Sequence, residues 1–333
     1  MLVVQALKKK KKFYIKKNNY RMKLFDNSKN NWFIFFANVL KFIFIDLRFK
    51  KIDLIHTHGV WNIFNLLFSL HAIFFKIPLI ISPCGMLEPW ALRQKRVKKF
   101  IAYILYQKFL LRNAKILIAK SYMEYKNLKF LGFRKISVIP NGIKVLKKNS
   151  QVSNKKKLHA LFLSRIHKKK GIYDLLISWS KVRPKNWVLN IVGTGADDCL
   201  KLLNRYSKNL EIKNIIFHGH LVDNDKKKIF KKSNLFILPS YSENFGNVIL
   251  EALNYRIPVL TTKATPWNSI SKFKCGWVID SGEESLTKHL KKILQLNYKT
   301  LLNMGLKSSK IIKKFDYSIT TKKIENLYGD LLK

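Results

Sequence analysis

Residues 235–254 of the chain read LFILPSYSENFGNVILEALN and join a short apolar run to an amphipathic pattern. The run Leu235–Leu238 predicts a buried strand, because consecutive apolar residues end abruptly at Pro239. From Gly246 to Tyr255 the apolar residues recur at helical spacing, which predicts a helix. A strand that leads through a polar loop into a helix is the repeating unit of a parallel, doubly wound sheet.

The same unit recurs on both sides of this segment. Further strands are predicted at Leu158–Leu163, Trp187–Ile191, Ile215–Phe217, Val259–Thr261 and Gly276–Ile279. Helices are predicted from Gly171 onward, at Asp198–Tyr206 and at Asp225–Lys232, and residues 283–333 are helical by pattern. These elements predict a complete α/β domain followed by C-terminal helices.

A second α/β series precedes the first one in the chain. Its predicted strands are Ile52–His56, Pro78–Ser82, Lys115–Ala119 and Ile136–Ile139, and its predicted helices are Trp61–Phe75, Pro89–Leu111 and Tyr122–Leu131. The polar, aperiodic stretch Lys144–Lys157 connects the two series. We therefore expect two Rossmann-like domains facing a cleft, at residues 1–145 and 146–310, with a helical tail at 311–333 that packs back on the N-terminal domain.

The composition is strongly basic but rich in apolar residues. The 333 residues include 65 Lys and Arg but only 19 Asp and Glu, which gives a formal net charge of +46, and 47% of the residues are hydrophobic. A hydrophobic fraction this large excludes a disordered basic tail, because it is sufficient to form a core. Part of the lysine excess resembles drift toward A/T-rich codons. The remainder predicts an anionic partner, which we expect to be a phosphate-bearing substrate or a membrane surface rather than nucleic acid, since no nucleic-acid-binding motif accompanies the lysines.

Several features bear on the cellular compartment. Three cysteines without a CxxC pair are typical of a reducing cytosol, and the lysine run after Met1–Ala6 reverses the order of a secretory signal. Leu54–Phe75 lacks charged residues and is long enough to be considered as a membrane span, but a polar stripe that includes Asn62, Asn65 and Ser69 favours a strand followed by an amphipathic helix. We expect a cytoplasmic protein.

A basic cluster, Arg93–Lys99, begins a predicted helix that continues with apolar residues. A basic amphipathic segment of this kind can attach peripherally to the inner face of the cytoplasmic membrane. The alternative is a solvated helix packed on its own sheet.

Polar residues that suit a phosphorylated sugar follow the predicted strands. Glu243 lies in the loop after the strand, and Glu251 lies two turns into the helix that Gly246 opens, so the two carboxylates flank a helix N-terminus that favours phosphate. Arg165 and Lys170, in another strand-to-helix loop, can neutralise a diphosphate. The alternative interpretation of the carboxylates is an exposed loop glutamate and an ordinary glutamate of the first helical turns.

These residues together resemble the group 1 (family 4) retaining glycosyltransferases of the GT-B fold, of the bacterial cell-surface polysaccharide type. The resemblance rests on Glu243-x7-Glu251, on Arg165 with Lys170-Gly171, on Gly193-Thr194-Gly195 and on Pro140-Asn141-Gly142. It implies transfer of a sugar from a nucleotide-diphosphate sugar to a saccharide or lipid-linked saccharide, with the anomeric configuration retained, in surface polysaccharide or lipopolysaccharide synthesis. No metal ion or other cofactor is expected.

The resemblance also implies roles for individual residues. The expected catalytic residues are Glu243, His58, Arg165 and Lys170. The expected donor-binding residues are Arg165, Lys170, Gly193, Glu243, Asn244, Phe245, Gly246, Asn247, Val248 and Glu251, with Glu243 at the sugar, Glu251 on the ribose and the cations and loop amides on the diphosphate. The expected acceptor-side residues are His56, His58, Cys84, Gly85 and Asn141.

The sequence departs from the family pattern at two places. Relatives often begin with a strand and a glycine-rich loop, whereas this chain has no glycine before Gly59. Relatives often carry His or Arg where Cys84 stands. The alternative function is therefore a catalytically impaired, nucleotide-sugar-binding homologue, and a phosphorylase is disfavoured because no pyridoxal lysine context is recognisable.

Overall fold

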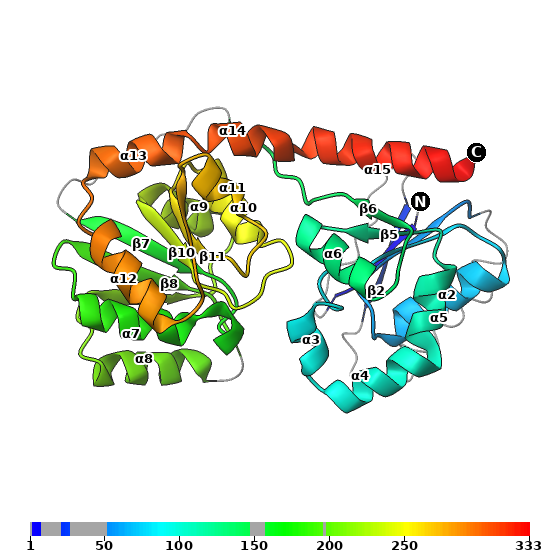
Figure 1. Ribbon diagram of the computed structural model, residues 1–333, viewed down its shortest axis with the longest axis horizontal. Coiled ribbons are helices and arrows are strands. Elements are labelled where there is room, and N and C mark those ends of the chain that lie inside the picture. Colours follow the sequence, from blue (N-terminus) through cyan, green and yellow to red (C-terminus); the bar gives the residue numbers. More distant parts are fainter. Residues whose placement is uncertain (1, 8–20, 27–51, 147–156, 196–197) are drawn as a thin grey trace. The chain divides into compact units, whose positions relative to one another are not determined.

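The computed structural model describes residues 2–7, 21–26, 52–146, 157–195 and 198–333 (Figure 1). The chain forms two compact units: unit 1 comprises Met1–Ile139 and Lys322–Lys333, and unit 2 comprises Pro140–Thr321. The division falls a few residues before the boundary expected at 145/146. Most of the expected connection Lys144–Lys157 lies outside the described residues.

Unit 2 is built on a parallel sheet whose described strands are ordered β12-β11-β10-β7-β8-β9. The strands are β7 (Leu158–Leu163), β8 (Trp187–Val192), β9 (Ile215–Gly219), β10 (Leu235–Leu238), β11 (Val259–Thr262) and β12 (Gly276–Ile279). The strand order reverses between β7 and β10. In open parallel sheets ligands bind beyond the carboxyl ends of the strands at such a switch point.

Helices cover both faces of the unit 2 sheet, with α7, α8 and α12 on one face and α9, α10 and α11 on the other (Figure 1). Their bounds are α7 (Ile172–Val182), α8 (Cys199–Asn209), α9 (Asp223–Lys232), α10 (Asn247–Asn254), α11 (Ser269–Lys272) and α12 (Glu283–Ile293). They are followed by α13 (Tyr298–Leu306), α14 (Ser309–Ile312) and the short turn η4 (Lys313–Phe315). Because helices shield both faces, β10 and β11 are buried along their whole length.

Unit 1 contains a parallel sheet with the order β3-β4-β5-β6 in its described part. Its strands are β3 (Ile55–His58), β4 (Leu79–Ser82), β5 (Ile116–Ala119) and β6 (Ile136–Val138), and a separate parallel pair joins β1 (Leu2–Leu7) to β2 (Arg21–Asp26). The helices are α2 (Ile63–Phe74), α3 (Pro89–Arg93), α4 (Arg96–Ala102), η2 (Tyr103–Gln107), α5 (Lys108–Asn113) and α6 (Tyr122–Phe130). The strand β1 lies near the start of the given sequence, where a strand is expected from the family resemblance, and residues 8–20 lie outside the described residues.

The C-terminal helix α15 (Tyr317–Leu332) packs with its second half on the unit 1 sheet. Side chains on one face of that sheet and on α15 form a single apolar cluster: Leu54, Ile80, Ile118 and Ile139 with Ile324, Leu327, Tyr328 and Leu331. The opposite side chains of the same strands, among them Ile55, Leu79 and Leu117, pack in a second cluster with residues of helices such as Phe68 of α2 and Leu128 of α6. The alternation along each strand therefore buries both faces of the sheet.

The structure confirms the predicted α/β class and places nearly every predicted element within a few residues. The single helix predicted at Pro89–Leu111 is wrong. Gln94 is extended and Lys95 is left-handed at φ +51°, which ends α3, and the chain then passes through the π-helical turn η2 before α5. No glycine or proline marks these changes, so the apolar periodicity runs through them without a local signal.

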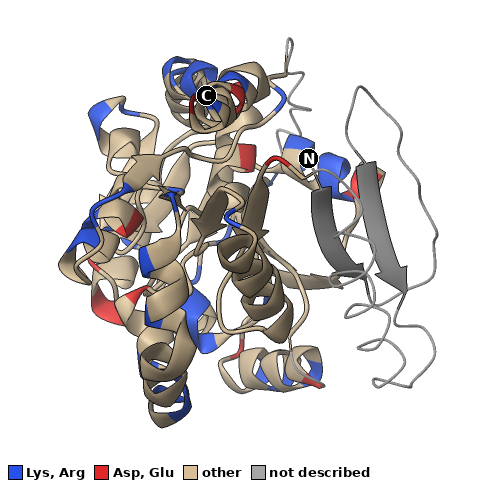
Figure 2. Cartoon of the chain, turned by 90° about the vertical axis from the view of Figure 1, so that its right-hand side faces the viewer, with Lys and Arg blue, Asp and Glu red and all other residues tan. Residues whose placement is uncertain are grey.

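No helix among the described residues is long and apolar enough to cross a membrane. The stretch Leu54–Phe75, considered above as a span, forms β3 and the twelve-residue helix α2. Figure 2 shows that Lys and Arg are spread over several helices rather than gathered on one element.

Candidate functional site: the loops after β7 and β10

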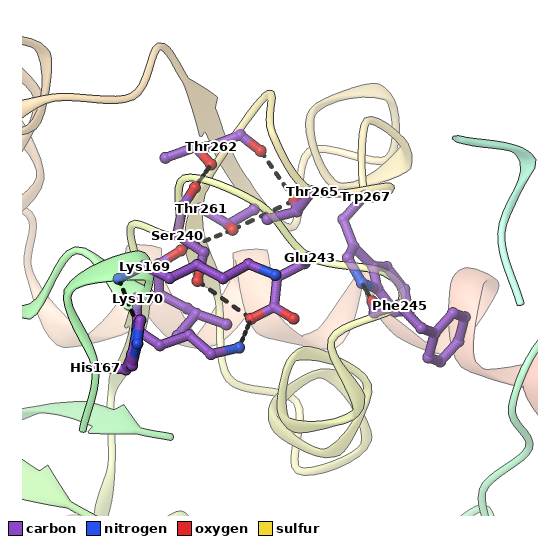
Figure 3. Close-up of polar contacts among 11 residues, drawn as sticks. His167, Lys169, Lys170, Ser240, Glu243, Phe245, Thr261, Thr262, Thr265 and Trp267 are labelled. Atoms are coloured by element: carbon purple, nitrogen blue, oxygen red, sulfur yellow. Dashed lines mark hydrogen bonds and ion pairs between the residues drawn. The ribbon is translucent and has the colours of Figure 1, made fainter. Parts of the chain in front are cut away.

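The loop between β10 and α10 is shaped by its backbone and by two aromatic side chains. Gly246 adopts φ +77° and caps α10, and since it has no side chain, it places no capping oxygen over the first amides of the helix, at Asn247 and Val248. Trp267 donates its indole N–H to the Phe245 carbonyl, and the two rings lie 5.3 Å apart (Figure 3). The loop thus presents the N-terminus of a two-turn helix at the carboxyl end of β10.

Glu243 lies within this loop and is 8% exposed. Its backbone N–H donates to Ala264 O at 3.1 Å. Its Oε1 accepts a hydrogen bond of 3.2 Å from Ser240 Oγ and forms an ion pair with Lys170 Nζ (Figure 3). The side chains of Lys170 and Glu243 are 13% and 10% exposed. The alternative of an exposed loop glutamate is therefore wrong.

Lys170 reaches Glu243 because the two strand-to-helix loops pack backbone to backbone. Lys170 ends the short turn η3 (Lys168–Lys170), and Gly171 follows at φ +68°. A Cβ atom at Gly171 would lie 2.1 Å from the Pro239 carbonyl oxygen, so only glycine fits. The Tyr241 N–H donates to the Lys169 carbonyl at 2.8 Å, and this bond fixes the register of the two loops.

Buried threonines hold the β10 loop from the neighbouring strand β11. Thr262 Oγ1 donates to Ser240 O at 2.5 Å, Thr261 Oγ1 donates to Leu238 O at 2.9 Å, and Thr265 Oγ1 donates to Thr262 O at 2.9 Å. These hydrogen bonds were not predicted from the sequence. A run of hydroxyl residues at the end of a predicted buried strand is the signal that could have revealed it.

The loops after β7 and β8, which carry Arg165 and Gly193, pack together. Gly193 adopts φ +142°, its N–H donates to Gly219 O at 2.7 Å, and a Cβ there would lie 1.8 Å from Ser164 O. Gly193 therefore serves loop packing. The Arg165 side chain is exposed and makes no hydrogen bond or ion pair with the described residues of the unit, which leaves its guanidinium for a ligand.

Glu251 and Asn247, both on α10, already have side-chain partners. Glu251 Oε2 lies 2.5 Å from Lys226 Nζ of α9, with the side chains 26% and 31% exposed. Asn247 Oδ1 accepts from Asn141 Nδ2 at 2.8 Å. Asn141, expected on the acceptor side of the N-terminal domain, thus lies in unit 2, next to a residue that was expected to bind the donor.

His56, an expected acceptor-side residue in unit 1, is engaged by the protein at both ring nitrogens. His56 Nε2 shares a 2.8 Å hydrogen bond with Ser82 Oγ, and Nδ1 shares one of 2.7 Å with the Tyr328 hydroxyl of α15. Burial, with contributions from His58 and Lys120, lowers the pKa of His56 to about 2. The neutral ring joins the sheet to the C-terminal helix, and neither nitrogen is left for a substrate.

His58, Cys84 and Gly85 gather at the carboxyl ends of β3 and β4. The His58 side chain is exposed, and its ring centre lies 4.3 Å from that of His56. Cys84 is half-buried in a left-handed turn at φ +54°, and burial raises the pKa of its thiol. The Gly85 N–H donates to Glu124 Oε1 at 2.6 Å. Glu124 was not predicted, because a glutamate in the first turn of a helix is too common to be singled out.

Comparison with known families decides which family the chain belongs to. Residues 144–310 match the family model of glycosyl transferases group 1, and residues 6–145 match that of glycosyltransferase family 4. The chain belongs to the group 1 glycosyl transferases. The buried Glu243, the helix opened by Gly246, and Glu251 all lie within the first of these matches.

Two of the relatives have names that refer to a cps region or to capsular polysaccharide biosynthesis. An uncharacterised 41.2 kDa protein in the cps region of Klebsiella pneumoniae is 28% identical over 228 residues, which cover 64% of this chain and 61% of that protein. The capsular polysaccharide biosynthesis glycosyltransferase CapM of Staphylococcus aureus is 25% identical over 178 residues, or 52% of this chain and 46% of CapM. The matched stretch thus spans less than two thirds of either relative.

Solved structures of similar fold are themselves GT-B glycosyltransferases. A sucrose-phosphate synthase from Thermosynechococcus elongatus superposes with a TM-score of 0.78 at 17% identity, covering 98% of this chain and 88% of that one. Anabaena HepE in complex with UDP-glucose gives a TM-score of 0.72 at 18% identity, with 92% and 86% covered. These similarities confirm the predicted GT-B fold of this glycosyl transferase. Within its described residues, no group of His, Cys, Asp and Glu side chains could hold a metal ion.

Proposed function

We propose that the protein is a retaining, hexosyltransferase-like enzyme that transfers a sugar from a nucleotide-diphosphate sugar to a saccharide or lipid-linked saccharide acceptor. The observation that carries this proposal is the buried Lys170–Glu243 pair beside the uncovered N-terminus of α10. A role in surface polysaccharide or lipopolysaccharide synthesis is supported by relatives such as CapM, and by the fold shared with the lipopolysaccharide outer core galactosyltransferase WaaB, at a TM-score of 0.61 and 18% identity.

The diphosphate of the donor binds to the amides of Asn247 and Val248. These N–H groups and the positive end of the helix dipole favour phosphate oxygens. Arg165 and Lys170 supply two cations, and they stabilise the charge that grows on the diphosphate as its bond to the sugar carbon breaks. Lys170 remains in contact with Glu243, so one side chain joins the phosphate site to the sugar site.

The two glutamates hold the groups on either side of the diphosphate. Glu243 accepts a hydroxyl of the donor sugar, with Ser240 and Lys170 fixing its carboxylate through Oε1. Glu251 accepts hydroxyls of the ribose. Because its Oε2 is engaged by Lys226, Oε1 is the oxygen that faces the ribose. Lys226 is then a positioning residue, in a lysine-rich helix that gave no reason to single it out.

Catalysis in this scheme consists of positioning and leaving-group stabilisation, and the reaction proceeds without a resident metal ion. The acceptor attacks from the face that the diphosphate leaves, so the configuration at the anomeric carbon is retained. The configuration of the new glycosidic bond, measured by proton NMR on the product, tests this step. An inverted product would contradict it.

The donor site is tested with a panel of nucleotide sugars, first by thermal shift and then by release of the nucleoside diphosphate. Glu243→Ala and Arg165→Ala should each lower the rate by about 100-fold or more, since each removes a group that stabilises the transition state. Arg183→Ala is the matched control, because the Arg183 side chain is 74% exposed and contacts Glu211 and the Ser180 carbonyl rather than any proposed donor residue. Equal rates in the wild type and the three variants would refute the assignment of Glu243 and Arg165 to the donor site. Donor binding without turnover in the wild type would instead support the alternative of an impaired homologue.

A cytoplasmic location with peripheral attachment to the membrane is proposed from the surface of α4 and η2. Large apolar side chains stand exposed there: Val97 (70%), Phe100 (63%), Ile104 (60%) and Leu105 (75%). Beside them lies a pocket of about 450 Å³ that is lined by apolar side chains such as Leu92 and by the basic residues Arg93, Arg96 and Lys99. Cations next to exposed apolar groups match an anionic bilayer. Sedimentation with anionic vesicles should show binding at low salt that high salt weakens, and no binding at low salt would refute it.

A further inference from the structure

The loops that follow β3, β4 and β5 come together in unit 1 around a lysine that the proposed mechanism does not use. His58 ends β3, Cys84 and Gly85 follow β4, and Lys120 directly follows β5. The three strands are parallel neighbours, so their carboxyl ends lie at one edge of the sheet. Glu124 joins two of the loops, because its Oε1 accepts from the Gly85 N–H at 2.6 Å and its Oε2 accepts from the Lys120 N–H at 2.7 Å.

Lys120 is only 8% exposed. Its ammonium forms no hydrogen bond or ion pair with any side chain or carbonyl in the described ranges of the unit. The carboxylate of Glu124 is the nearest candidate partner in sequence, but both of its oxygens are aimed at backbone N–H groups. A buried ammonium without a counter-ion is costly, and such a group is retained most readily where a ligand supplies the missing charge.

Among the described groups around Lys120, the Glu124 carboxylate brings negative charge, but its two oxygens are shared with the Gly85 and Lys120 backbone N–H groups. The remaining groups bring none. His56 is neutral and both of its nitrogens are engaged. Desolvation of the partly exposed His58 ring by the surrounding protein, with the positive charge of Lys120, lowers the pKa of His58, so that ring is also neutral at physiological pH. Burial raises the pKa of the Cys84 thiol. Burial likewise lowers the pKa of Lys120, with Cys84 and Glu124 opposing the shift in part. An anionic group of a ligand therefore suits the environment of the Lys120 ammonium better than a neutral ligand hydroxyl does.

We propose that Lys120 and the exposed ring of His58 bind an oxyanion, a phosphate or carboxylate group, carried by the acceptor saccharide. The acceptor is then an anionic sugar rather than a neutral one. This inference rests on the proposed function, in which unit 1 binds the acceptor. The ammonium pairs with the oxyanion, and the neutral imidazole donates one hydrogen bond to it or accepts one from a neighbouring sugar hydroxyl.

Calorimetric titration of the full chain with a hexose 6-phosphate, a hexuronate and the parent hexose tests the proposal. One anionic sugar should bind at least about tenfold more tightly than the hexose, and which of the two does so identifies phosphate or carboxylate as the recognised group. Lys120→Met should abolish that preference, and Lys120→Arg should keep most of it. Lys115→Met is the matched control, because Lys115 is exposed and stands at the opposite end of β5. Equal binding of all three sugars to the wild type would overturn the inference, as would an unchanged preference in Lys120→Met.

Donor cleavage without acceptor separates this inference from the proposed function. Lys120 lies in unit 1, whereas the proposed donor residues lie in unit 2, so Lys120→Met should release nucleoside diphosphate at the wild-type rate. If the wild type does not cleave any donor but still binds an anionic sugar in a way that depends on Lys120, the proposed function is contradicted and the inference about Lys120 is not. Urea unfolding of Lys120→Met should match the wild type, because methionine removes a buried charge without leaving a cavity. An unfolded variant would instead mean that Lys120 is structural.

Discussion

Replacement of Lys170 by methionine probes the ion pair at the centre of the proposed donor site. The Lys170 and Glu243 side chains are 13% and 10% exposed, so the pair is nearly withdrawn from solvent. Removing one partner of a buried pair costs about 3–5 kcal/mol, mainly because the remaining charge is left uncompensated. Ser240 still donates to Glu243 at 3.2 Å in the variant. We therefore expect Lys170→Met to lower the free energy of unfolding of unit 2 by about 3 kcal/mol, the lower end of that range.

Urea denaturation followed by tryptophan fluorescence measures this loss, since Trp179, Trp187 and Trp267 are all buried in unit 2. Lys168→Met is the matched control. Lys168 belongs to the same short turn but is exposed, so its loss should change the stability by less than about 0.5 kcal/mol. The double variant Lys170→Met with Glu243→Gln should cost less than the sum of the single changes, with a coupling energy of about 2 kcal/mol. If Lys170→Met costs no more than Lys168→Met, the pair is not buried as described and the reasoning fails.

Two further predictions concern the frame around the proposed sites. In urea denaturation, Gly171→Ala should lower the stability of unit 2 by clearly more than Gly219→Ala does. Both glycines have φ near +67°, a backbone conformation that costs a residue with a side chain about 1–2 kcal/mol. Of the two positions, Gly171 is the one where the added Cβ would meet a carbonyl oxygen, at 2.1 Å. Equal losses would show that the two loops do not pack as tightly as described. His56→Gln should weaken the acid sensitivity of unit 1, because the pKa of His56 falls from 6.5 to about 2 on folding, so below pH 6.5 the unfolded chain binds a proton that the folded chain does not. This difference in proton binding lowers the free energy of unfolding of the wild type by about 2 kcal/mol at pH 5 relative to pH 7.5. If the stability of His56→Gln depends on pH as that of the wild type does, His56 is not the source of the acid sensitivity.

The order of elements followed from local pattern alone. Apolar runs of three to six residues predict the strands, and helical spacing predicts most helices. The end of the apolar run at Pro239 also predicts that the polar loop with Glu243 and Gly246 follows a strand. These signals depend on neighbours a few residues apart, and burial of both faces of a parallel sheet makes them strong. The break at Gln94 and Lys95 was missed because backbone torsions there carry no compositional mark.

The partners of the functional side chains lie far away in the sequence and follow only from the tertiary structure. Lys170 and Glu243 are 73 residues apart and meet because Gly171 lets two loops touch, while His56 is bound by Tyr328, 272 residues away. Asn141 contacts Asn247 in unit 2, and the buried Lys120 ammonium forms no hydrogen bond or ion pair with the described residues. Periodicity reports which face of an element is buried, but not which element covers it. Residue types at the strand ends could therefore be predicted from the sequence, whereas their pairing and burial, and with them the distinction between a ligand group and a structural one, required the folded chain.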